Sequence, residues 1–466
     1  MDTAGASTNI STLVTTVLLT TVGLALLRRA LNLPRIKVIA SPLRSVLPQL
    51  SPEQVAQLEY PLDIFPGARD VASPYGSIRV YEFGPVSGRK VLMVHGISTS
   101  CQTLGRVARQ LVDSAGCRVM LFDLFGRGFS DGVGDLPHDA RLYCSQMLCA
   151  LASSPLPWTG KSAFDVIGYS MGGGVAVHFS TAFPDMIRSL VLLAPAGLIR
   201  PERFGVAARL IFTSGIVPER LLANVTRRRL RRPLASGLKA KQRQLAAAGK
   251  ASSSAQSPEK HGSEPLEMAV AEAMDAHSAA VEVIPPEPQG VLWSMQVGRY
   301  VRWMLSHHDG FVPAFMSCIR DAPLVGQEEA WTRLAELVRG SSTAEGKKKL
   351  PLCMVLGGQD EVVDAGDYEK DVLPLFGGLE TGNVFWSLVP GGHDFPMTYS
   401  RHVLRAIFKF WGEGDDALAN LQAEEIREAS MGKQAGKVHG TITASRKSTD
   451  SEENSGCKPA SVESIQ

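Results

Sequence analysis

Short apolar runs alternate with amphipathic segments along much of this 466-residue chain. Two of these runs, Val91–Val94 and Leu190–Leu193, contain no polar residue. Strands of this kind are buried on both faces, which is typical of a parallel sheet covered by helices on both sides. The pattern therefore predicts an α/β fold with a mostly parallel central sheet. Further strands are expected at residues 64–72, 78–83, 119–122, 164–167, 352–356 and 384–388, and helices at 107–112, 141–151, 171–183 and 403–411.

The alternation of strands and helices stops after Ala194 and resumes at Leu352. The stretch between these residues has helical patterns and irregular chain. Within it, residues 234–288 are rich in Ala, Ser, Lys, Gln and Pro, a composition that buries little apolar surface and indicates a disordered or loosely helical insertion. The predicted organisation is a linker at 31–59, a core in two parts at 60–197 and 346–412, a helical insertion at 198–345 and a disordered polar tail at 413–466.

Overall charge and cysteine content exclude several classes of protein. The formal net charge is +2, so a nucleic-acid partner is not indicated. The seven cysteines include no close pair, which argues against a disulfide framework and against a zinc site built from Cys and His. We therefore expect reduced thiols, no metal and no cofactor.

The N-terminus contains a long uncharged segment. Residues Ile10 to Leu27 carry no charge, and Arg28 and Arg29 follow them directly. This pattern predicts a single membrane anchor within residues 1–30, and the basic flank places the main domain on the cytoplasmic side. A cleaved signal peptide is an alternative that lacks its usual basic start, and a buried or interfacial helix is another. Glycosylation triplets at Asn9 and Asn224 would fit a lumenal domain instead.

The pentapeptide Gly168-Tyr169-Ser170-Met171-Gly172 lies between a predicted strand and a predicted helix. This is the context of a nucleophile elbow, in which a sharp turn exposes a serine hydroxyl. The residues two positions before and after the serine must be nearly free of side chain, and both are glycine. The sequence therefore identifies Ser170 as a candidate nucleophile. The N–H of Met171, the next residue, is expected to donate to the oxyanion that forms during acyl transfer.

A serine hydroxyl is a poor nucleophile unless a base accepts its proton. In this fold class the triad follows the chain order Ser, Asp, His. His393 comes after the last predicted strand in a glycine-containing turn, and Asp360 ends the strand before it. Glu361 and Asp364 are alternatives to Asp360. His178 lies within a predicted helix and lacks this placement. His307 and His308 belong to the helical insertion, where they are expected at the surface or as part of the pocket lining.

These elements resemble the α/β-hydrolase superfamily. Its motifs appear in family order, beginning with His95-Gly96 after a strand and the turn 123–130 (Asp-Leu-Phe-Gly-Arg-Gly-Phe-Ser), and continuing with the elbow, Asp360 and His393. The resemblance implies an α/β-hydrolase fold over residues 60–412, with a helical cap inserted after the sixth sheet strand. It also implies that the N–H of Ile97 is the second oxyanion donor, whereas His95 and the turn 123–130 are structural.

The cap implied by this resemblance would cover the site with apolar side chains. We expect a substrate pocket at Trp293, Trp303, Phe311 and Phe315, helped by Met295, Met304 and Met316, although these residues could equally form the core of the cap itself. Such a pocket would bind apolar acyl esters as substrates. The arginine-rich run at 227–232 could contact anionic lipid head groups or could be a solvated face.

The resemblance and the serine nucleophile together imply a membrane-associated serine hydrolase that cleaves carboxylic esters through an acyl-enzyme. Relatives with aspartate at the elbow, such as epoxide hydrolases, are excluded by Ser170. Carbon–carbon bond hydrolysis uses the same triad and stays an alternative, for which the stretch Ser317–Asp321 with Arg320 could bind an acidic substrate. A non-catalytic ligand-binding protein on the same fold is the alternative of a different class.

Overall fold

The computed structural model describes residues 3–31, 36–200, 219–230, 285–340, 349–413, 417–421 and 423. In the N-terminal helix, side chains are described for residues 12–26. The chain divides into two compact units, Met1–Trp411 and Gly412–Gln466, and the fold below is that of the first. Most of the predicted disordered insertion at 234–288 and of the predicted tail at 413–466 lies outside the described residues.

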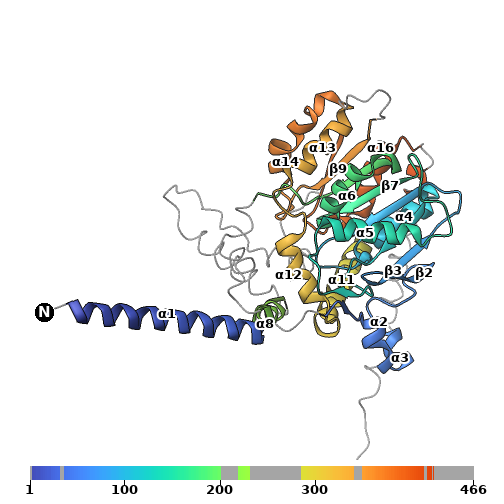
Figure 1. Ribbon diagram of the computed structural model, residues 1–466. Helices are drawn as coiled ribbons and strands as arrows, with labels where there is room; N and C mark the ends of the chain where they lie inside the picture. The colour runs from blue at the N-terminus through green and yellow to red at the C-terminus, as the bar shows by residue number, and fades with distance from the viewer. Residues whose placement is uncertain are drawn as a thin grey trace, which may run out of the picture. The chain divides into compact units, whose positions relative to one another are not determined.

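An eight-stranded sheet forms the centre of the first unit (Figure 1). Its strands are β2 (Ala68–Ser73), β3 (Gly76–Phe83), β4 (Lys90–Val94), β5 (Arg118–Phe122), β7 (Phe164–Tyr169), β8 (Ile187–Leu193), β9 (Leu352–Gly357) and β10 (Val384–Val389). Their spatial order is β10-β9-β8-β7-β4-β5-β3-β2. Only β3 runs against its neighbours in this sheet, and every other adjacent pair is parallel. The mostly parallel sheet that the apolar runs predicted is therefore confirmed.

Helices pack against this sheet in two layers. One layer contains α4 (Gly105–Ala115), α15 (Phe395–Thr398) and α16 (Ser400–Trp411), and the other contains α5 (Ala140–Ala152), α6 (Met171–Ala182) and α13 (Glu328–Arg339). Local sequence sets their ends. The Asp139 side chain accepts hydrogen bonds from the first N–H groups of α5, and Gly116 ends α4 in the left-handed conformation that glycine adopts without strain.

The helical insertion lies between β8 and β9, the sixth and seventh strands of the sheet in chain order. Its described helices are α8 (Glu219–Leu230), α11 (Pro288–His307), α12 (Phe311–Asp321) and α13. The start of α11 is fixed to the core because Glu287 accepts hydrogen bonds from Arg106 (2.7 Å), Ser400 (2.9 Å) and the N–H of Arg401 (2.8 Å). In contrast to α11 and α12, α13 packs on α6 of the core.

The segment from 36 to 60, most of which was expected to be a linker, is part of the core. It contains α2 (Pro42–Ser45), α3 (Pro52–Ala56) and β1 (Val38–Ile39), which pairs with β6 (Gly132–Val133) in a separate two-stranded sheet. The buried Asp131 accepts hydrogen bonds from the N–H groups of Ser41 (2.8 Å) and Ser77 (2.6 Å). Further along, the Tyr60 hydroxyl donates to the buried carboxylate of Asp123 at 3.0 Å. Two buried carboxylates thus attach this segment to the sheet.

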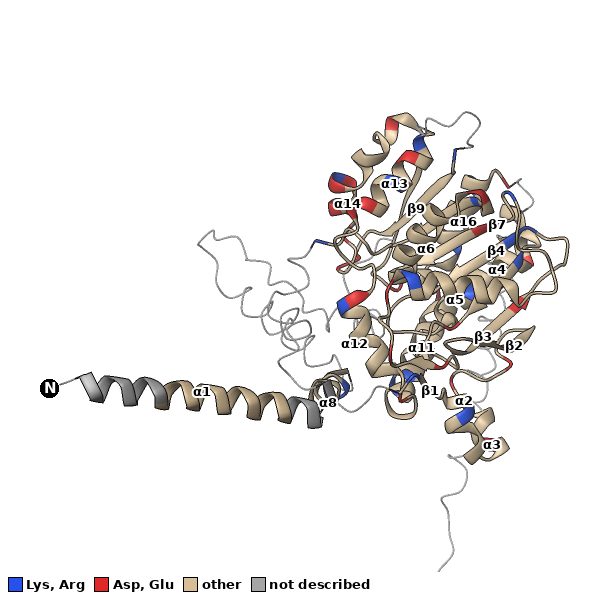
Figure 2. Ribbon diagram, viewed as in Figure 1, with Lys and Arg blue, Asp and Glu red and all other residues tan. Residues whose placement is uncertain are grey.

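The N-terminal helix α1 (Thr3–Leu31) exposes its apolar side chains. Figure 2 shows no Lys, Arg, Asp or Glu along its described stretch. Nevertheless, within the described residues no helix combines the length and hydropathy that crossing a bilayer requires. The predicted single-pass anchor at residues 1–30 is therefore not supported by the described residues. In α1 these include the side chains of residues 12–26.

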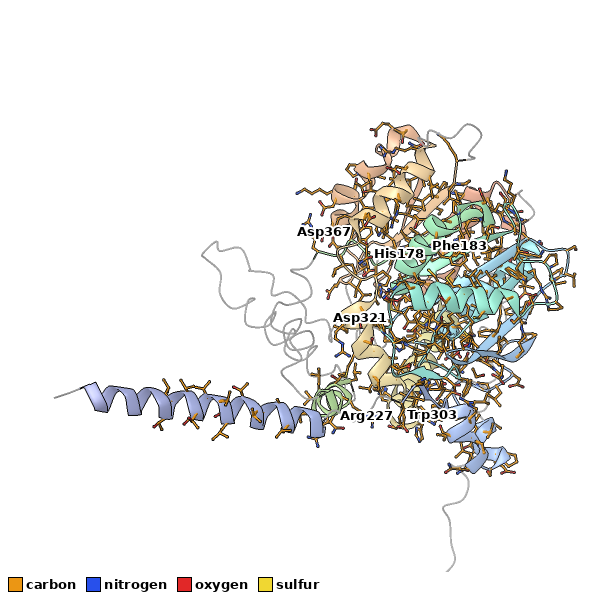
Figure 3. All side chains as sticks on the ribbon, in the orientation of Figure 1. His178, Phe183, Arg227, Trp303, Asp321 and Asp367 are labelled. Carbon is orange, nitrogen blue, oxygen red and sulfur yellow. The ribbon has the colours of Figure 1, made fainter. Side chains whose placement is uncertain are left out.

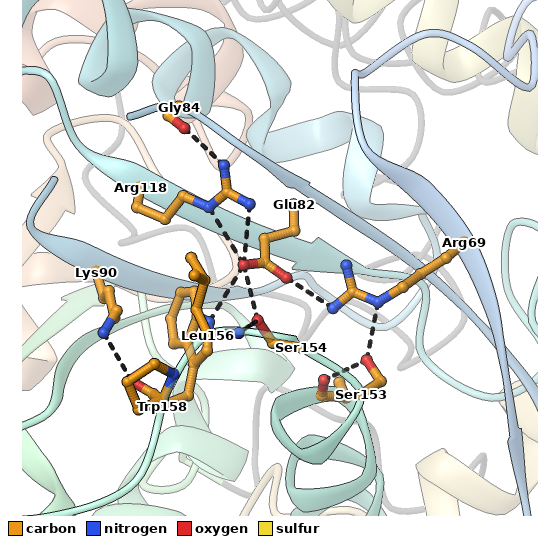
Figure 4. A network of polar contacts seen from close by, with 11 residues as sticks. Arg69, Glu82, Gly84, Lys90, Arg118, Ser153, Ser154, Leu156 and Trp158 are labelled. Carbon is orange, nitrogen blue, oxygen red and sulfur yellow. Dashed lines mark hydrogen bonds and ion pairs between the residues drawn. The ribbon is translucent and has the colours of Figure 1, made fainter. Parts of the chain in front are cut away.

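A buried carboxylate joins three strands at the β2 edge of the sheet (Figure 4). Glu82 on β3 forms ion pairs with Arg69 on β2 (2.8 Å) and Arg118 on β5 (3.1 Å). It also accepts hydrogen bonds from Ser154 (2.9 Å) and Trp158 (3.3 Å) in the loop after α5. Burial acts to raise the pKa of Glu82, but the Ser154 hydrogen bond and the two arginine charges outweigh it and hold the pKa below its usual value.

We predict that Glu82→Gln lowers the free energy of unfolding by about 2 kcal/mol at pH 7, because charge-assisted hydrogen bonds are lost and the two arginines remain. A depressed carboxylate pKa contributes stability above the unfolded pKa, about 4.3, and loses it as pH falls through the folded value. The gap between wild type and variant should therefore shrink below about pH 4 in urea titrations. Glu329→Gln is the control, since its pair with Arg333 is exposed. An equal effect of both substitutions would contradict the prediction.

Candidate active site

Ser170 lies in the turn between the end of β7 and the start of α6. Its backbone has φ 53° and ψ −123°, a conformation that residues other than glycine rarely adopt. The turn is fixed on both sides, because the Ser170 N–H donates to the carbonyl of Leu193 on β8 (3.0 Å) and the N–H of Ala196 donates to the Ser170 carbonyl (2.8 Å). The strand–turn–helix context predicted for the elbow is present, with the strained serine at its tip.

Glycine is required on both sides of this serine. A Cβ atom at Gly172 would lie 2.3 Å from the Val94 carbonyl oxygen and 2.5 Å from that of His95. A Cβ at Gly168 would lie 2.5 Å from the Gly172 oxygen. All of these neighbours are backbone atoms, which cannot move aside as a flexible side chain would. The elbow is therefore packed directly against the end of β4, where the predicted oxyanion loop begins.

Ser170, His393 and Asp360 form a chain of hydrogen bonds. His393 Nε2 is 3.0 Å from Ser170 Oγ, and its Nδ1 is 2.7 Å from Asp360 Oδ2. The other carboxylate oxygen, Oδ1, accepts from the N–H groups of Val362 and Val363, both at 2.8 Å. All three triad side chains are buried. Backbone N–H groups therefore hold Oδ1 of Asp360 in place, and Oδ2 orients the imidazole of His393.

The two alternatives to Asp360 lie elsewhere. Glu361 is exposed, and Asp364 accepts a hydrogen bond from the N–H of Asp367 as the N-cap of α14 (Ala365–Asp371). The turns that carry Asp360 and His393 are also joined through backbone, because the Gln359 N–H donates to the Gly391 carbonyl at 3.0 Å. The structure therefore brings together the acid and base that the sequence favoured.

Tyr169 is a contributor that the sequence analysis did not single out. Its hydroxyl donates to the backbone carbonyl of His393 at 2.8 Å, and the two rings lie 5.2 Å apart between centroids. Tyr169, which precedes Ser170, therefore supports the loop that carries His393. Its place beside Ser170 was visible in the sequence, but the partner is 224 residues away along the chain.

The predicted oxyanion donors belong to the two segments that meet where the elbow packs against the end of β4. Met171 belongs to the elbow, and Ile97 belongs to the loop after β4. Met171 begins α6, where the first N–H groups have no partner within the helix. Ile97 lies two residues after His95. The Nε2 atom of His95 accepts from the N–H of Leu124 (2.9 Å), so the ring carries its proton on Nδ1, 2.9 Å from the Gly96 carbonyl. Burial, and then the charge of Arg127, lowers the pKa of His95 to about 3, so this tautomer is neutral at working pH. His95 thus holds the peptide that carries the Ile97 N–H.

The remaining histidines considered from sequence have other partners. His178 projects from α6 (Figure 3), and its Nε2 lies 2.7 Å from Gln327 Oε1. His308 is buried with Nε2 3.0 Å from the Ser130 carbonyl, and His307 stacks on Trp303 with ring centroids 4.7 Å apart. These contacts place the three imidazoles in packing roles outside the triad.

The four expected pocket residues fall into two groups. Phe311 and Phe315 are buried on α12 with ring centroids 6.3 Å apart. Trp293 donates from its indole nitrogen to the Gln102 carbonyl (2.9 Å), and Trp303, labelled in Figure 3, stacks on Tyr300 at 5.5 Å. The phenylalanines thus share one side of α12, whereas both tryptophans have specific partners on or beneath α11.

Comparison with known proteins gives partial matches. The family model described as serine aminopeptidase, S33, matches residues 87–253. A serine hydrolase-like protein of Danio rerio is 31% identical over 129 residues, which are 28% of this chain and 38% of that protein. Lipase LipV of Mycobacterium tuberculosis is 32% identical over 119 residues, 26% of this chain and 42% of the lipase. The chain therefore matches less than half the length of these two relatives. The crystal structure of a putative lipase from Acinetobacter baumannii has a TM-score of 0.48 at 12% identity, over 80% of this chain and 98% of that one.

We predict that Gly172→Ala lowers the free energy of unfolding by about 1–3 kcal/mol, because its methyl group meets backbone oxygens that cannot yield. Chemical denaturation of the purified protein measures this. Gly358→Ala is a matched control, since a Cβ there meets nothing closer than the Val389 oxygen at 3.5 Å. Equal stability of the two variants would show that the elbow tolerates a side chain at this position.

Proposed function

We propose that this chain, an α/β-hydrolase by fold and by its match to the family model, is a serine hydrolase that cleaves carboxylic esters. The observation that carries the proposal is the buried succession Asp360–His393–Ser170, with heavy-atom distances of 2.7 and 3.0 Å. These distances lie within the reach that proton transfer between a nucleophile and its base requires. The names of the partial relatives, a serine hydrolase-like protein and a lipase, favour the same chemistry.

In the first half of the proposed reaction, His393 Nε2 takes the proton of Ser170 Oγ as the oxygen attacks the ester carbonyl carbon. The carbonyl becomes an oxyanion, which the N–H groups of Met171 and Ile97 stabilise. Asp360 keeps the imidazole in the correct tautomer and stabilises its positive charge. His393 then protonates the leaving alcohol as the carbon–oxygen bond breaks, which leaves an acyl group on Ser170.

In the second half, water replaces the alcohol and repeats these steps. His393 accepts a proton from the water, the resulting hydroxide attacks the acyl carbon, and Ser170 leaves with the proton that His393 returns. The side chains of this chain supply all the proton transfers in both halves. Neither half needs a cofactor.

We infer that the substrates are apolar esters. The described part of the cap supports this, because Phe311, Phe315 and Met316 are buried on α12. The same helix packs on the turn that follows β5, since a Cβ on Gly126 would lie 2.5 Å from the Cβ of Ala314. Arg320, which an acidic substrate would need, is only half-buried. An apolar acyl group therefore suits this helix better than a carboxylate.

We predict that Ser170 reacts as an activated nucleophile. A fluorophosphonate probe should label the wild-type protein stoichiometrically, since its phosphorus forms a stable bond to an activated serine oxygen. Ser170→Ala should abolish labelling, and His393→Ala should slow both labelling and ester hydrolysis by about 10³-fold or more while the fold survives. Gel fluorescence and hydrolysis of p-nitrophenyl esters measure the two effects.

His178→Ala is the matched control and should label at the wild-type rate, because its imidazole bonds Gln327. A folded wild-type protein that does not label would favour a non-catalytic binding role. Acyl esters of graded chain length, tested beside p-nitroanilides and dienoic ketones, then separate esterase activity from amide and carbon–carbon bond cleavage. Faster turnover of either of the last two classes would replace the ester proposal.

Contact with membrane lipid is a further part of the proposal. The described stretch of α1 exposes eight large apolar side chains, namely Leu13, Val14, Val17, Leu18, Leu19, Val22, Leu24 and Leu26. Exposed apolar surface of this extent favours a lipid or protein partner.

We predict that deletion of residues 1–30 moves the protein from the membrane pellet to the supernatant when cells are fractionated. Deletion of residues 424–466 serves as the control and should leave the distribution unchanged. Pelleting of the first variant at the wild-type level would remove α1 from the membrane proposal.

A further inference from the structure

Arg127 is a fully buried cation in the turn after β5. The resemblance to the α/β-hydrolases implies only a structural role for this turn. Taking a guanidinium out of water is costly, so a buried arginine is normally paired with a carboxylate. Among the described residues, however, no carboxylate forms an ion pair with Arg127, and its hydrogen bonds go to uncharged groups. The charge therefore has to be held by carbonyl, phenol and thiol dipoles.

The guanidinium contacts the predicted oxyanion loop directly. Its Nε donates to the carbonyl of Ile97 at 2.9 Å, and its Nη1 donates to the carbonyl of Phe125, also at 2.9 Å. Hydrogen bonds from a charged donor are shorter and about twice as strong as neutral ones. The two carbonyls bind one rigid, planar group, so the loop after β4 and the turn after β5 keep a fixed separation.

Arg127 and His95 hold neighbouring peptides of the same loop. His95 Nδ1 lies 2.9 Å from the Gly96 carbonyl, whose peptide carries the N–H of Ile97, and Arg127 binds the carbonyl of Ile97 itself. The Ile97 N–H is thus fixed from both sides. An oxyanion donor must point at the position where negative charge develops. A change in the orientation of either peptide would therefore turn the Ile97 N–H away from that position.

The same guanidinium reaches the cap. Its Nη2 donates to the buried thiol of Cys318 on α12 (3.2 Å), and its Nη1 also donates to the Tyr143 hydroxyl on α5 (3.0 Å). Tyr143 lies 3.1 Å from the same sulfur atom. One side chain therefore joins the oxyanion loop to the helix that carries Phe311 and Phe315, without contacting the triad.

We infer that Arg127 is a positioning residue for the oxyanion hole, which aims the Ile97 N–H and ties it to cap helix α12. The inference rests on the proposed hydrolase function. It assigns Arg127 no contact with substrate. Its loss should weaken binding of the tetrahedral state selectively and leave ground-state binding of the ester unchanged.

The test compares wild type with Arg127→Met and Arg127→Lys. Each purified full-length protein is titrated with the fluorophosphonate to count active sites, and kcat and KM are measured with one p-nitrophenyl ester. The inhibition constant of a trifluoromethyl ketone of the same acyl chain reports on the oxyanion hole, because Ser170 converts it into a hemiketal oxyanion. For Arg127→Met we expect kcat per site to fall about 10- to 100-fold, below the loss seen when an oxyanion donor is itself removed. The inhibition constant should rise by a similar factor, with KM within about twofold. Arg127→Lys keeps the charge but loses the planar, forked set of donors. Its kcat and inhibition constant should lie between those of wild type and Arg127→Met.

Arg109→Met is the matched control. Like Arg127, Arg109 donates to a backbone carbonyl, that of Ile64, but its side chain is exposed and lies over the ring of Trp293. This control should leave kcat and the ketone constant unchanged. Tyr143→Phe removes one neutral partner of the guanidinium, and we expect a loss of about two- to fivefold in both values, consistent with one uncharged hydrogen bond. If Arg127→Met does not fold, the ketone inhibition of Tyr143→Phe, together with that of Arg127→Lys, tests the inference.

Several outcomes would overturn the inference. Unchanged ketone inhibition per active site in Arg127→Met, or in both Arg127→Lys and Tyr143→Phe, would show that the loop is aimed without Arg127. A loss of activity that matches the loss of titratable sites would show a role in folding alone. These results leave ester hydrolysis by the wild type intact. A wild-type protein that neither hydrolyses esters nor binds the ketone would instead remove the hydrolase proposal, and this inference with it.

Discussion

The imidazole of His393 uses both of its nitrogens at once, one toward a carboxylate and one toward a hydroxyl. Hydrogen bonds weaken steeply when the donor and acceptor move apart or tilt, so this ring has little freedom of position. Much of the surrounding structure holds it there. Tyr169 fixes the backbone of His393, and the Asp360 turn is joined to the His393 turn through Gln359 and Gly391.

The order of the sheet explains how three distant residues converge. Ser170 follows β7, Asp360 follows β9 and His393 follows β10, and all three strands run in the same direction within β10-β9-β8-β7. The carboxyl ends of parallel strands form one edge, which is where α/β proteins place their sites. The intervening strand β8 contributes backbone instead, because the Leu193 carbonyl accepts the N–H of Ser170.

Local patterns made the strands predictable, and they also singled out the three side chains that the structure brings together at the candidate site. The buried strands β4 and β8 each contain four apolar residues in succession. Glycine stands two residues before and after Ser170, and a Cβ at Gly172 would collide with backbone. Features that depend on distant contacts left no such pattern. The two-residue strands β1 and β6 are too short to show alternation, and nothing local distinguishes Arg127 from a surface arginine. The uncharged run near the N-terminus predicted a bilayer-spanning anchor that the described helices do not support.

The attachment of the segment 36–60 affects how this protein can be divided. Asp123 begins the turn that contains Arg127, and Asp131 directly follows this turn. Both accept hydrogen bonds from the segment 36–60, through Tyr60 and Ser41. A chain shortened to start after Tyr60 would leave two buried carboxyl groups short of hydrogen-bond donors next to the candidate active site. The first strand of the large sheet is therefore not the natural start of the folding unit. Exchange of N-terminal regions between related proteins would have to carry this stretch along with the domain.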